Sequence, residues 1–150
     1  MLQWNCKRFE ELSPAELYAL LRLRSEVFVV EQNCVFLDMD NMDQGCWHLL
    51  GTNEAGELVA YTRLVPPGHI YPMASIGRVV SAPSARRTGA GRELMQESIK
   101  KVYDLFGKGD IKIGAQYYLK NFYASFGFEQ VSDIYLEDGI EHIYMILKAS

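Results

Sequence analysis

The stretch Arg86-Arg87-Thr88-Gly89-Ala90-Gly91 decides the fold expected for this chain. A strand-like run, Ser75 to Val80, precedes it, and a helix-like run, Arg92 to Phe106, follows it. Glycines let a backbone approach a ligand closely, and the first free N–H groups of a helix point at an anion. Neighbouring arginines add charge-assisted hydrogen bonds. The pattern therefore predicts a cradle for a phosphate-bearing cofactor.

Length and composition are typical of a globular protein. The chain has 150 residues, of which 49% are hydrophobic and 23% charged, so we expect a single domain spanning residues 1–150. The net charge of −4 argues against general nucleic-acid binding, which needs a basic face. No run is long enough to cross a bilayer, and the N-terminus lacks the apolar core of a signal peptide. A cytoplasmic protein without nucleic-acid or membrane partners is therefore expected.

The three cysteines, Cys6, Cys34 and Cys46, form neither a C-x-x-C pair nor a cluster with zinc-ligand spacing. An odd number of cysteines without a disulfide framework indicates a reducing compartment. We expect no metal site, and a structural or incidental role for Cys34 and Cys46.

Hydrophobic periodicity predicts strands and helices in the order β-α-β-β-β-α-β-α-β-β. The first helix begins at the capping box Ser13-Pro14-Ala15-Glu16 and runs to about Val30. The expected strands are 2–9, 47–52, 58–65, 75–80, 111–115, 128–135 and 142–147, and the later helices are 92–106 and 117–126. This order predicts an α/β fold with a mixed sheet rather than a doubly wound one.

Three kinds of phosphate loop, and a plain helix entry, compete for the stretch 86–91. A P-loop requires Lys-Ser or Lys-Thr after its glycines, and none follows here. A dinucleotide fingerprint requires a third glycine, but Gly89-Ala90-Gly91 is followed by Arg92-Glu93-Leu94. The remaining pattern, [Arg/Gln]-x-x-Gly-x-[Gly/Ala] between a strand and a helix, resembles the coenzyme A loop of the GNAT superfamily of N-acetyltransferases.

A second motif carries the same resemblance. Members of this superfamily often have an Asn, a Tyr seven residues later, and then Gly-Phe, and this chain has Gln116, Tyr123 and Gly127-Phe128. The departures are Gln for Asn and Leu119 in place of a small residue, although a Gln can still hydrogen-bond a pantetheine amide. Four further stretches resemble the ElaA-like branch of the superfamily: Val27 to Gln32, Tyr61 to Pro66, Ile76 to Val80, and Glu137 to His142.

The resemblance implies a GNAT-like fold in which acetyl-CoA enters a splay between strands 75–80 and 111–115. Gln116 and Tyr123 would lie beside the cofactor, and a backbone N–H of Val79 or Val80 would polarise the thioester carbonyl. The backbone of the first of these strands would bind the pantetheine arm through Val79, Val80 and Ser81. The cradle for the phosphates would comprise Arg86, Arg87, Thr88, Gly89, Ala90, Gly91 and Arg92.

The resemblance also implies transfer of the acetyl group to a primary amine by direct attack on the thioester. Tyr123 is placed to protonate the leaving thiolate, since a phenol stays protonated at neutral pH; its alternative role is core packing. Some family members use a Glu on the strand that here carries Arg78, so the base must be a water wire or another residue. The candidate bases are Glu31, His48, Glu137 and His142. His48 could point into the cleft or lie in the core, and Glu137 to His142 could instead be ordinary turn chemistry.

The segment 31–46 lies where the family has a substrate-facing loop. Its three acids, Asp38, Asp40 and Asp43, could attract a cationic amine or form a solvated acidic face. The glycine and distal Glu of a calcium loop are not in register.

Two functions of different class follow. The first is acetyl transfer from acetyl-CoA to a primary amine of a small molecule or peptide. The second is a non-catalytic acyl-CoA-binding sensor or regulatory module, which the missing strand Glu would explain. The sequence does not name the amine, and a homodimer is compatible with either function.

Overall fold

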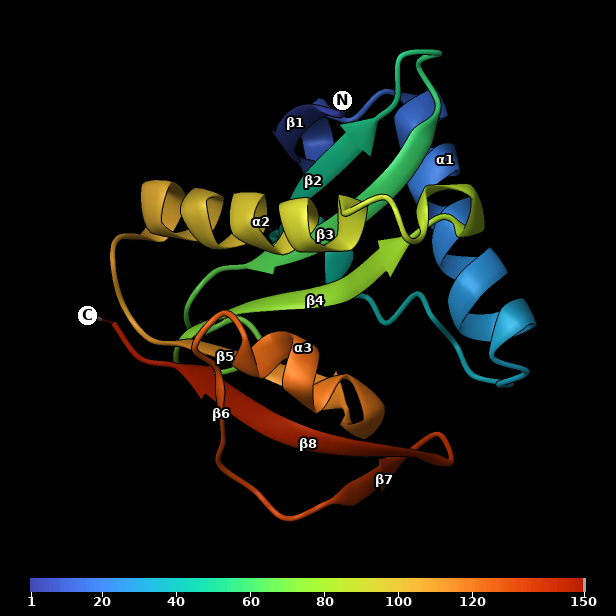
Figure 1. Cartoon of the computed structure of the whole chain (residues 1–150). Coiled ribbons are helices and arrows are strands. Elements are labelled where there is room, and N and C mark those ends of the chain that lie inside the picture. Colours follow the sequence, from blue (N-terminus) through green and yellow to red (C-terminus); the bar gives the residue numbers. More distant parts are fainter. Residues whose placement is uncertain (150) are drawn as a thin grey trace.

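The computed structural model describes residues 1–149, which contain a mixed eight-stranded sheet (Figure 1). The strands are β1 (Gln3–Arg8), β2 (Trp47–Thr52), β3 (Leu58–Val65), β4 (Ala74–Ser81), β5 (Ile111–Gln116), β6 (Glu129–Gln130), β7 (Tyr135–Glu137) and β8 (Ile140–Leu147). Their order is β1-β2-β3-β4-β5-β8-β6, and β7 also pairs with β8. β4 and β5 run parallel, whereas the other neighbours run antiparallel. The expected mixed α/β sheet is confirmed.

Three α-helices accompany the sheet: α1 (Pro14–Arg24), α2 (Ala90–Phe106) and α3 (Lys120–Ala124). α1 begins at the expected capping box, in which the Glu16 N–H donates to Ser13 Oγ and the Ser13 N–H donates to Glu16 Oε1. Short 3-10 turns are η1 (Phe9–Glu11), η3 (Asp43–Gly45), η4 (Pro83–Ala85) and η5 (Tyr117–Leu119). No helix among residues 1–149 is long and apolar enough to cross a membrane.

The first helix does not continue to Val30 as an α-helix. From Ser25 to Glu31 it widens into a π-helical segment, η2. Three of these residues are valines, and β-branched side chains have a lower preference for the α-helix. The Gln32 N–H accordingly donates to the Val27 carbonyl, five residues back. Such wider turns are frequent at functional sites.

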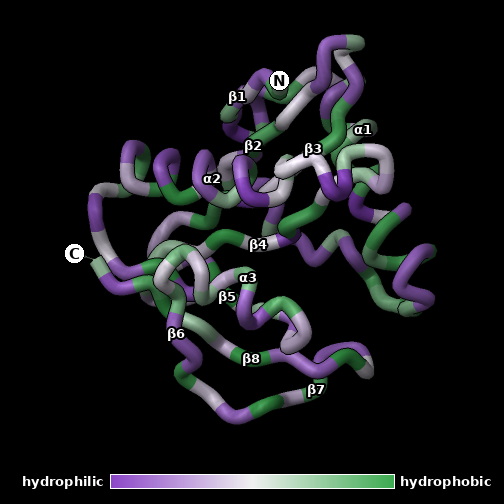
Figure 2. The backbone as a smooth tube through the Cα atoms, viewed as in Figure 1, coloured by the Kyte–Doolittle hydropathy of each residue, from purple (hydrophilic) through white to green (hydrophobic). Residues whose placement is uncertain are grey.

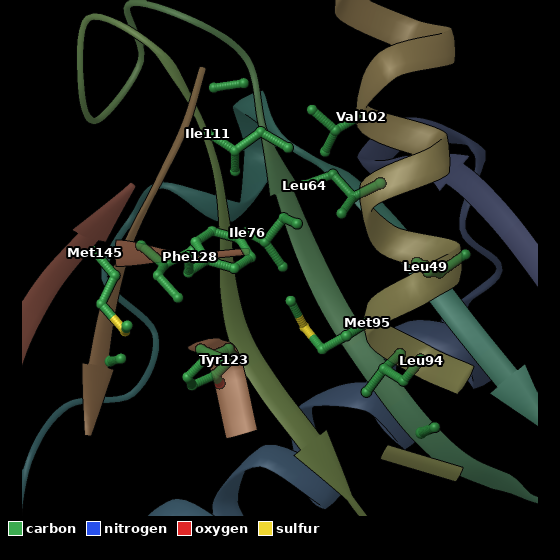
Figure 3. Packing of buried hydrophobic residues seen from close by; sticks show 14 of the residues in the cluster. Leu49, Leu64, Ile76, Leu94, Met95, Val102, Ile111, Tyr123, Phe128 and Met145 are labelled. Atoms are coloured by element: carbon green, nitrogen blue, oxygen red, sulfur yellow. The ribbon is translucent and has the colours of Figure 1, made fainter. Parts of the chain in front are cut away.

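Helices cover both faces of the sheet. From α2, Leu94, Met95 and Val102 pack against the buried side chains of the central strands (Figure 3). Hydrophobic and hydrophilic residues alternate along this helix (Figure 2), which is the pattern of a half-buried helix. α1 and η2 pack on the opposite face, where Leu20 and Val27 belong to the cluster around Tyr61.

The pairing of β4 with β5 is restricted to one end of the two strands. The register joins Ala74 to Ile111 and Ser75 to Lys112, and no further pair follows among the described residues. Beyond this point β4 is no longer paired with β5, which stays paired with β8 along its length. α3 lies over this part of the sheet in the view of Figure 1, and its Tyr123 packs with Ile113 and Ile143. The expected splay is therefore present.

A bulge in β4 begins where the two strands part. Tyr61 of β3 faces Val80 and Arg63 faces Gly77, so three steps on β4 oppose two steps on β3. The extra residue lies at Arg78, whose φ of 50° is left-handed. Non-glycine residues adopt this conformation at a cost of about 1–3 kcal/mol and need support from their surroundings.

A buried network of ion pairs supplies that support. Arg78 Nε donates to Asp38 Oδ1 at 2.8 Å, and its Nη2 donates to the Asp38 carbonyl at 2.7 Å. Arg24 Nε of α1 donates to the other Asp38 oxygen at 2.8 Å. The full network pairs the guanidinium groups of Arg24, Arg63 and Arg78 with the carboxylates of Asp38, Asp40 and Asp43.

The interpretation of the three acids as a solvated face, or as an attractor for a cationic amine, is therefore wrong. Asp38 and Asp43 are buried, and arginines already neutralise the three carboxylates. Burial alone would raise the pKa of Asp40, but the hydrogen bonds and charge of Arg63 outweigh it and lower the pKa to about 2.

The single strand expected over 128–135 is two short strands, β6 and β7. Gln130 pairs with Met145 and Tyr135 pairs with His142. The chain therefore advances five residues from β6 to β7 while β8 advances only three. The Ser132 hydroxyl accepts the Tyr144 N–H at 2.9 Å within this interruption. The side chain thus takes the place of a backbone partner.

Replacing Asp38 by alanine should destabilise the protein by about 3–5 kcal/mol, because Arg24 and Arg78 then lose a buried anionic partner. Urea unfolding of D38A and wild type measures the difference. D133A, at an exposed aspartate in the β6–β7 connection, is the control and should unfold like wild type. An equal midpoint for D38A and wild type would contradict a supporting role for the network.

Candidate functional site

A cleft of about 600 Å³ occupies the splay between β4 and β5. One wall is η2 and the residues that follow it, and the opposite wall is η5 with α3. The beginning of α2 lies at one end, and the turn between β7 and β8 also contributes. Because β4 is not paired with β5 here, the backbone polar groups on that edge are free to bind a ligand that lies along it.

The stretch 86–91 forms one end of this cleft. Gly89 caps α2 with a φ of 86°, and Arg87 also has a left-handed φ of 63°. The first helical bond of α2 is donated by the Glu93 N–H to the Gly89 carbonyl, so the preceding N–H groups at the helix start have no helical partner. Arg86 and Gly91 line the cleft. These features make an anion-binding helix start.

Other residues expected in the cradle point elsewhere. The Thr88 hydroxyl donates to the Ala85 carbonyl, which fixes the loop. Arg92 Nη1 donates to Ser125 Oγ at 3.0 Å, and its guanidinium lies 4.6 Å from the Phe126 ring centroid, so this arginine faces α3. Arg87 is exposed and lies outside the cleft lining. Thr88 and Arg92 therefore shape the cradle, while their side chains are already engaged.

Two contacts cross the cleft from the end of the first helix. The Glu31 carboxylate accepts hydrogen bonds from both terminal nitrogens of Arg86, and this pairing lowers the pKa of Glu31. The amide side chains of Gln32 and Gln116 exchange hydrogen bonds of 3.2 Å. In this arrangement Glu31 occupies the anion-binding face of Arg86. Glu31 is thus a counter-ion of Arg86 at the end of the cleft beside the α2 start, rather than a base near the middle of the cleft.

The middle of the cleft lies along the bulged part of β4. Val79, Val80 and Ser81 line it, as expected for residues that offer backbone groups to a ligand. Gln116, at the end of β5, lines the opposite side. The positions of these four residues agree with a narrow, extended ligand running from the α2 start toward the centre of the sheet.

Tyr123 lies in the wall of the cleft, and Figure 3 shows it at the edge of the core cluster. Its ring packs edge-on against Phe122 and Phe128, with centroids 5.2 and 6.1 Å away. Burial is the main reason that the pKa of Tyr123 is raised, and nearby Tyr118 adds to it. The phenol therefore remains a proton donor throughout the neutral range. Tyr123 therefore packs in the core and also lines the cleft.

Glu137 and His142 come together across the β7–β8 hairpin and line the same cleft. His142 Nδ1 lies 2.8 Å from the Ile140 carbonyl, which can only accept, so this nitrogen carries the proton in the neutral ring. The other nitrogen, Nε2, lies 3.7 Å from Glu137 Oε2. The turn residues Asp138 and Gly139 have φ of 51° and 78°, as in a type I′ turn. The hairpin thus presents an imidazole nitrogen and a carboxylate to the cleft.

His48 does not point into the cleft. It is fully buried, and its ring nitrogens contact the Tyr61 hydroxyl at 2.6 Å and the Asp43 carbonyl at 2.9 Å. Burial lowers the pKa of His48, so the ring is neutral in the fold. β2 is separated from the splay by β3 and β4, and His48 is a core residue beside the ion network.

The cleft lining also contains residues that had no binding or catalytic role assigned from the sequence, among them Gln32, Phe36 and Arg78. For Arg78, one indication of a special role was available in the sequence: a basic residue stands on the strand where some family members have a Glu. Its contact with Asp38, 40 residues away, depends on tertiary structure. Within residues 1–149 no group of three or more His, Cys, Asp or Glu side chains is placed to hold a metal ion.

The sequence and the fold have close counterparts among known proteins. Residues 24–149 match the family model described as an acetyltransferase (GNAT) domain. A UPF0039 protein of Synechocystis sp. is 44% identical over 98% of this chain and 96% of its own length, and Escherichia coli ElaA is 41% identical over 97% and 95%.

Solved structures agree with these relatives. A Pseudomonas aeruginosa acyl-CoA N-acyltransferase has a TM-score of 0.91 and 40% identity, covering 97% of this chain and 99% of its own. The E. coli ElaA structure has a TM-score of 0.91 and 39% identity, covering 99% and 100%. The chain therefore belongs to the GNAT acetyltransferase family, in the branch that contains ElaA.

Proposed function

We propose that this protein transfers an acetyl group from acetyl-CoA to a primary amine by direct attack on the thioester. The observation that carries the proposal is the cleft in the β4–β5 splay. It runs from an anion-binding helix start to a phenol on one wall and an imidazole–carboxylate pair on another. Family membership supports acyl transfer, and the arrangement of these groups supports an amine as acceptor.

The residues of the cleft fit coenzyme A. The α2 start, with Arg86, would hold the diphosphate, and the bulged part of β4 would pair with the pantetheine arm as a further strand would. When bound, the cofactor supplies an acyl carbon activated as a thioester and a thiolate leaving group. A backbone N–H of Val79 or Val80 would stabilise negative charge on the thioester oxygen, an effect worth about 2.7–4 kcal/mol per donor in other enzymes.

Proton movements can be assigned to side chains that line the cleft. The attacking amine must give up a proton, and His142 Nε2 would accept it, with Glu137 stabilising the resulting imidazolium. As the N–C bond forms and the C–S bond breaks, Tyr123 would donate its proton to the departing sulfur. The cleft thus offers an acceptor for the amine proton and a donor for the departing sulfur.

The proposal is tested by transfer to a panel of primary amines, with free thiol as the readout and cofactor binding measured by calorimetry. Thiol release above the hydrolysis blank is expected with at least one amine. Tight cofactor binding without transfer to any amine would instead support the sensor function.

Exchanging Glu31 for glutamine should strengthen acetyl-CoA binding about two- to five-fold. The cofactor then no longer competes with a carboxylate for Arg86, and the effect stays small because solvent screens an exposed ion pair of this kind. Calorimetric titration of E31Q and wild type at equal ionic strength measures the effect. E129Q, at an exposed glutamate on β6, should bind like wild type. Weaker binding by E31Q would show that Glu31 contributes to the site directly.

Changing Tyr123 to phenylalanine should lower kcat by about 100-fold and leave acetyl-CoA affinity nearly unchanged, since only the proton donor is removed. Y103F, on the far part of α2, is the control and should keep wild-type turnover. Because the pKa of Tyr123 is raised, the wild-type rate should show no fall from Tyr123 ionisation below about pH 10. Wild-type turnover in Y123F would remove the phenol from the acid role.

Changing His142 to glutamine should lower kcat/KM by about 100-fold at neutral pH, because the group that accepts the amine proton is gone. H69Q is the matched control, since His69 lies outside the cleft lining on the β3–β4 connection. Near wild-type turnover of H142Q would point to a water wire or to Glu137 acting alone.

A further inference from the structure

The imidazole of His142 belongs to a series of aromatic rings in contact. Tyr135 of β7 is paired with His142 of β8 across the hairpin, and their rings stack with centroids 5.8 Å apart and planes at 27°. Tyr135 also stacks with Tyr144, two residues further along β8, with centroids 4.7 Å apart and planes at 29°. Both separations lie within the range in which aromatic rings attract one another. Tyr135 therefore contacts two side chains that β8 directs to the same face.

Residues outside the hairpin anchor the far end of this series. The Tyr71 ring meets Tyr144 edge-on, with centroids 5.9 Å apart and planes at 82°. Lys112 Nζ of β5 lies 4.4 Å from the ring centroid of Tyr144 and 4.7 Å from that of Tyr71, within the distance of a cation–π interaction. The Tyr144 N–H donates to the Ser132 hydroxyl. Tyr144 is thus a fixed backing for Tyr135.

Gly114 of β5 provides the space for the Tyr135 hydroxyl. Its neighbours Ile113 and Ala115 belong to the core cluster that packs with α2, so position 114 faces the opposite side of the sheet. A Cβ at this position would lie 3.1 Å from the Tyr135 hydroxyl oxygen, which is closer than ordinary van der Waals contact. Gly114 lies within a strand and has no left-handed φ, so its backbone does not require glycine. The position of Tyr135 explains the absent side chain.

The other contacts of His142 constrain only part of its orientation. The Ile140 carbonyl accepts from Nδ1, and Glu137 Oε2 lies 3.7 Å from Nε2. Both partners bind ring nitrogens, whose hydrogen-bonding directions lie in the plane of the ring. The stacked face of Tyr135 opposes tilting out of that plane, and it also attracts the positive charge that forms when the imidazole accepts a proton. Hydrogen bonds and stacking together therefore set the direction of Nε2.

The two stacked residues differ in what they line. His142 lines the cleft, whereas Tyr135 lies outside that lining and borders an adjoining cavity of about 250 Å³. We propose that Tyr135 is a positioning residue, whose ring holds the imidazole of His142 with Nε2 directed toward the acceptor amine. The ring and not the hydroxyl exerts this effect. The inference rests on the proposed acetyltransferase function and adds a residue to its proton transfer.

The first test replaces the Tyr135 ring. Y135L should lower kcat on the order of ten-fold and leave acetyl-CoA affinity unchanged, because the base remains but is no longer held in the productive direction. Y135F keeps the ring and should restore near wild-type kcat. Y18L, at an exposed tyrosine of α1, is the control and should keep wild-type turnover. Wild-type kcat in Y135L would overturn the inference. A higher acceptor KM in Y135F would also overturn it, since the hydroxyl would then bind the acceptor.

A double-mutant cycle separates positioning from general support of the fold. Because Tyr135 acts through His142, Y135L should cause no further loss of kcat in an H142Q background. An equal loss in both backgrounds would show that Tyr135 acts independently of His142, and the inference would then fail.

Changing Gly114 to alanine tests the same contact from β5. The added methyl group should displace the Tyr135 ring and lower kcat by about the same factor as Y135L does. Removal of the hydroxyl in the double variant G114A/Y135F relieves the close contact and should recover kcat. G109A, on an open loop where an added Cβ meets nothing within 4 Å, should keep wild-type turnover. A loss in G114A that Y135F does not recover would overturn the assignment of this space to Tyr135.

A measurement without turnover separates this inference from the proposed function. NMR spectra of the His142 ring nitrogens, recorded where the ring is neutral, report which nitrogen carries the proton. Wild type and Y135F should show the Nδ1-protonated form that the Ile140 carbonyl selects, and Y135L should show a mixture of both forms. An unchanged Nδ1-protonated form in Y135L would overturn the inference. A mixture in Y135L, with no transfer to any amine by wild type, would instead overturn the proposed function.

Discussion

The hydrogen bonds from Arg78 to Asp38 hold the rest of the site in place. They stabilise a left-handed residue in the middle of β4, and this residue creates the bulge at which β4 leaves β5. Without the bulge, β4 could continue to pair with β5, and its backbone groups would be used within the sheet. The cleft and the free edge of β4 that lines it both follow from this local departure from regular pairing.

The ion network also ties the cleft to elements far from it. Arg24 belongs to α1, Arg63 to β3 and Arg78 to β4, and the acids that join them lie in one connecting segment. Buried ion pairs contribute little net stability, because desolvation offsets their attraction, but loss of one partner is costly. The arrangement therefore fixes geometry more than it adds free energy. It keeps η2, which follows α1, at a set distance from the bulge.

Local patterns were sufficient to predict the glycine-capped helix start after β4 but not its surroundings. Glycines and arginines between a strand and a helix predict the α2 start because all the required groups lie within a few residues. His48 was misplaced because alternation along a strand does not tell which face meets the cleft; that depends on the strand's place in the sheet. The aspartates were misread for a related reason. Arg24 and Arg78 lie 14 and 40 residues from Asp38, and no sequence spacing connects them.

The chemistry of the cysteines favours direct attack over a covalent acyl-enzyme. An acyl-cysteine requires a thiolate in the cleft. Cys34 lines the cleft, but its thiol donates a hydrogen bond to the Asp138 carbonyl, 3.3 Å from Sγ. Burial raises the pKa of Cys46 to about 11, and its thiol is bonded to the Met42 carbonyl. Direct attack needs no such carrier, because it requires only that both reactants be held together in one cleft.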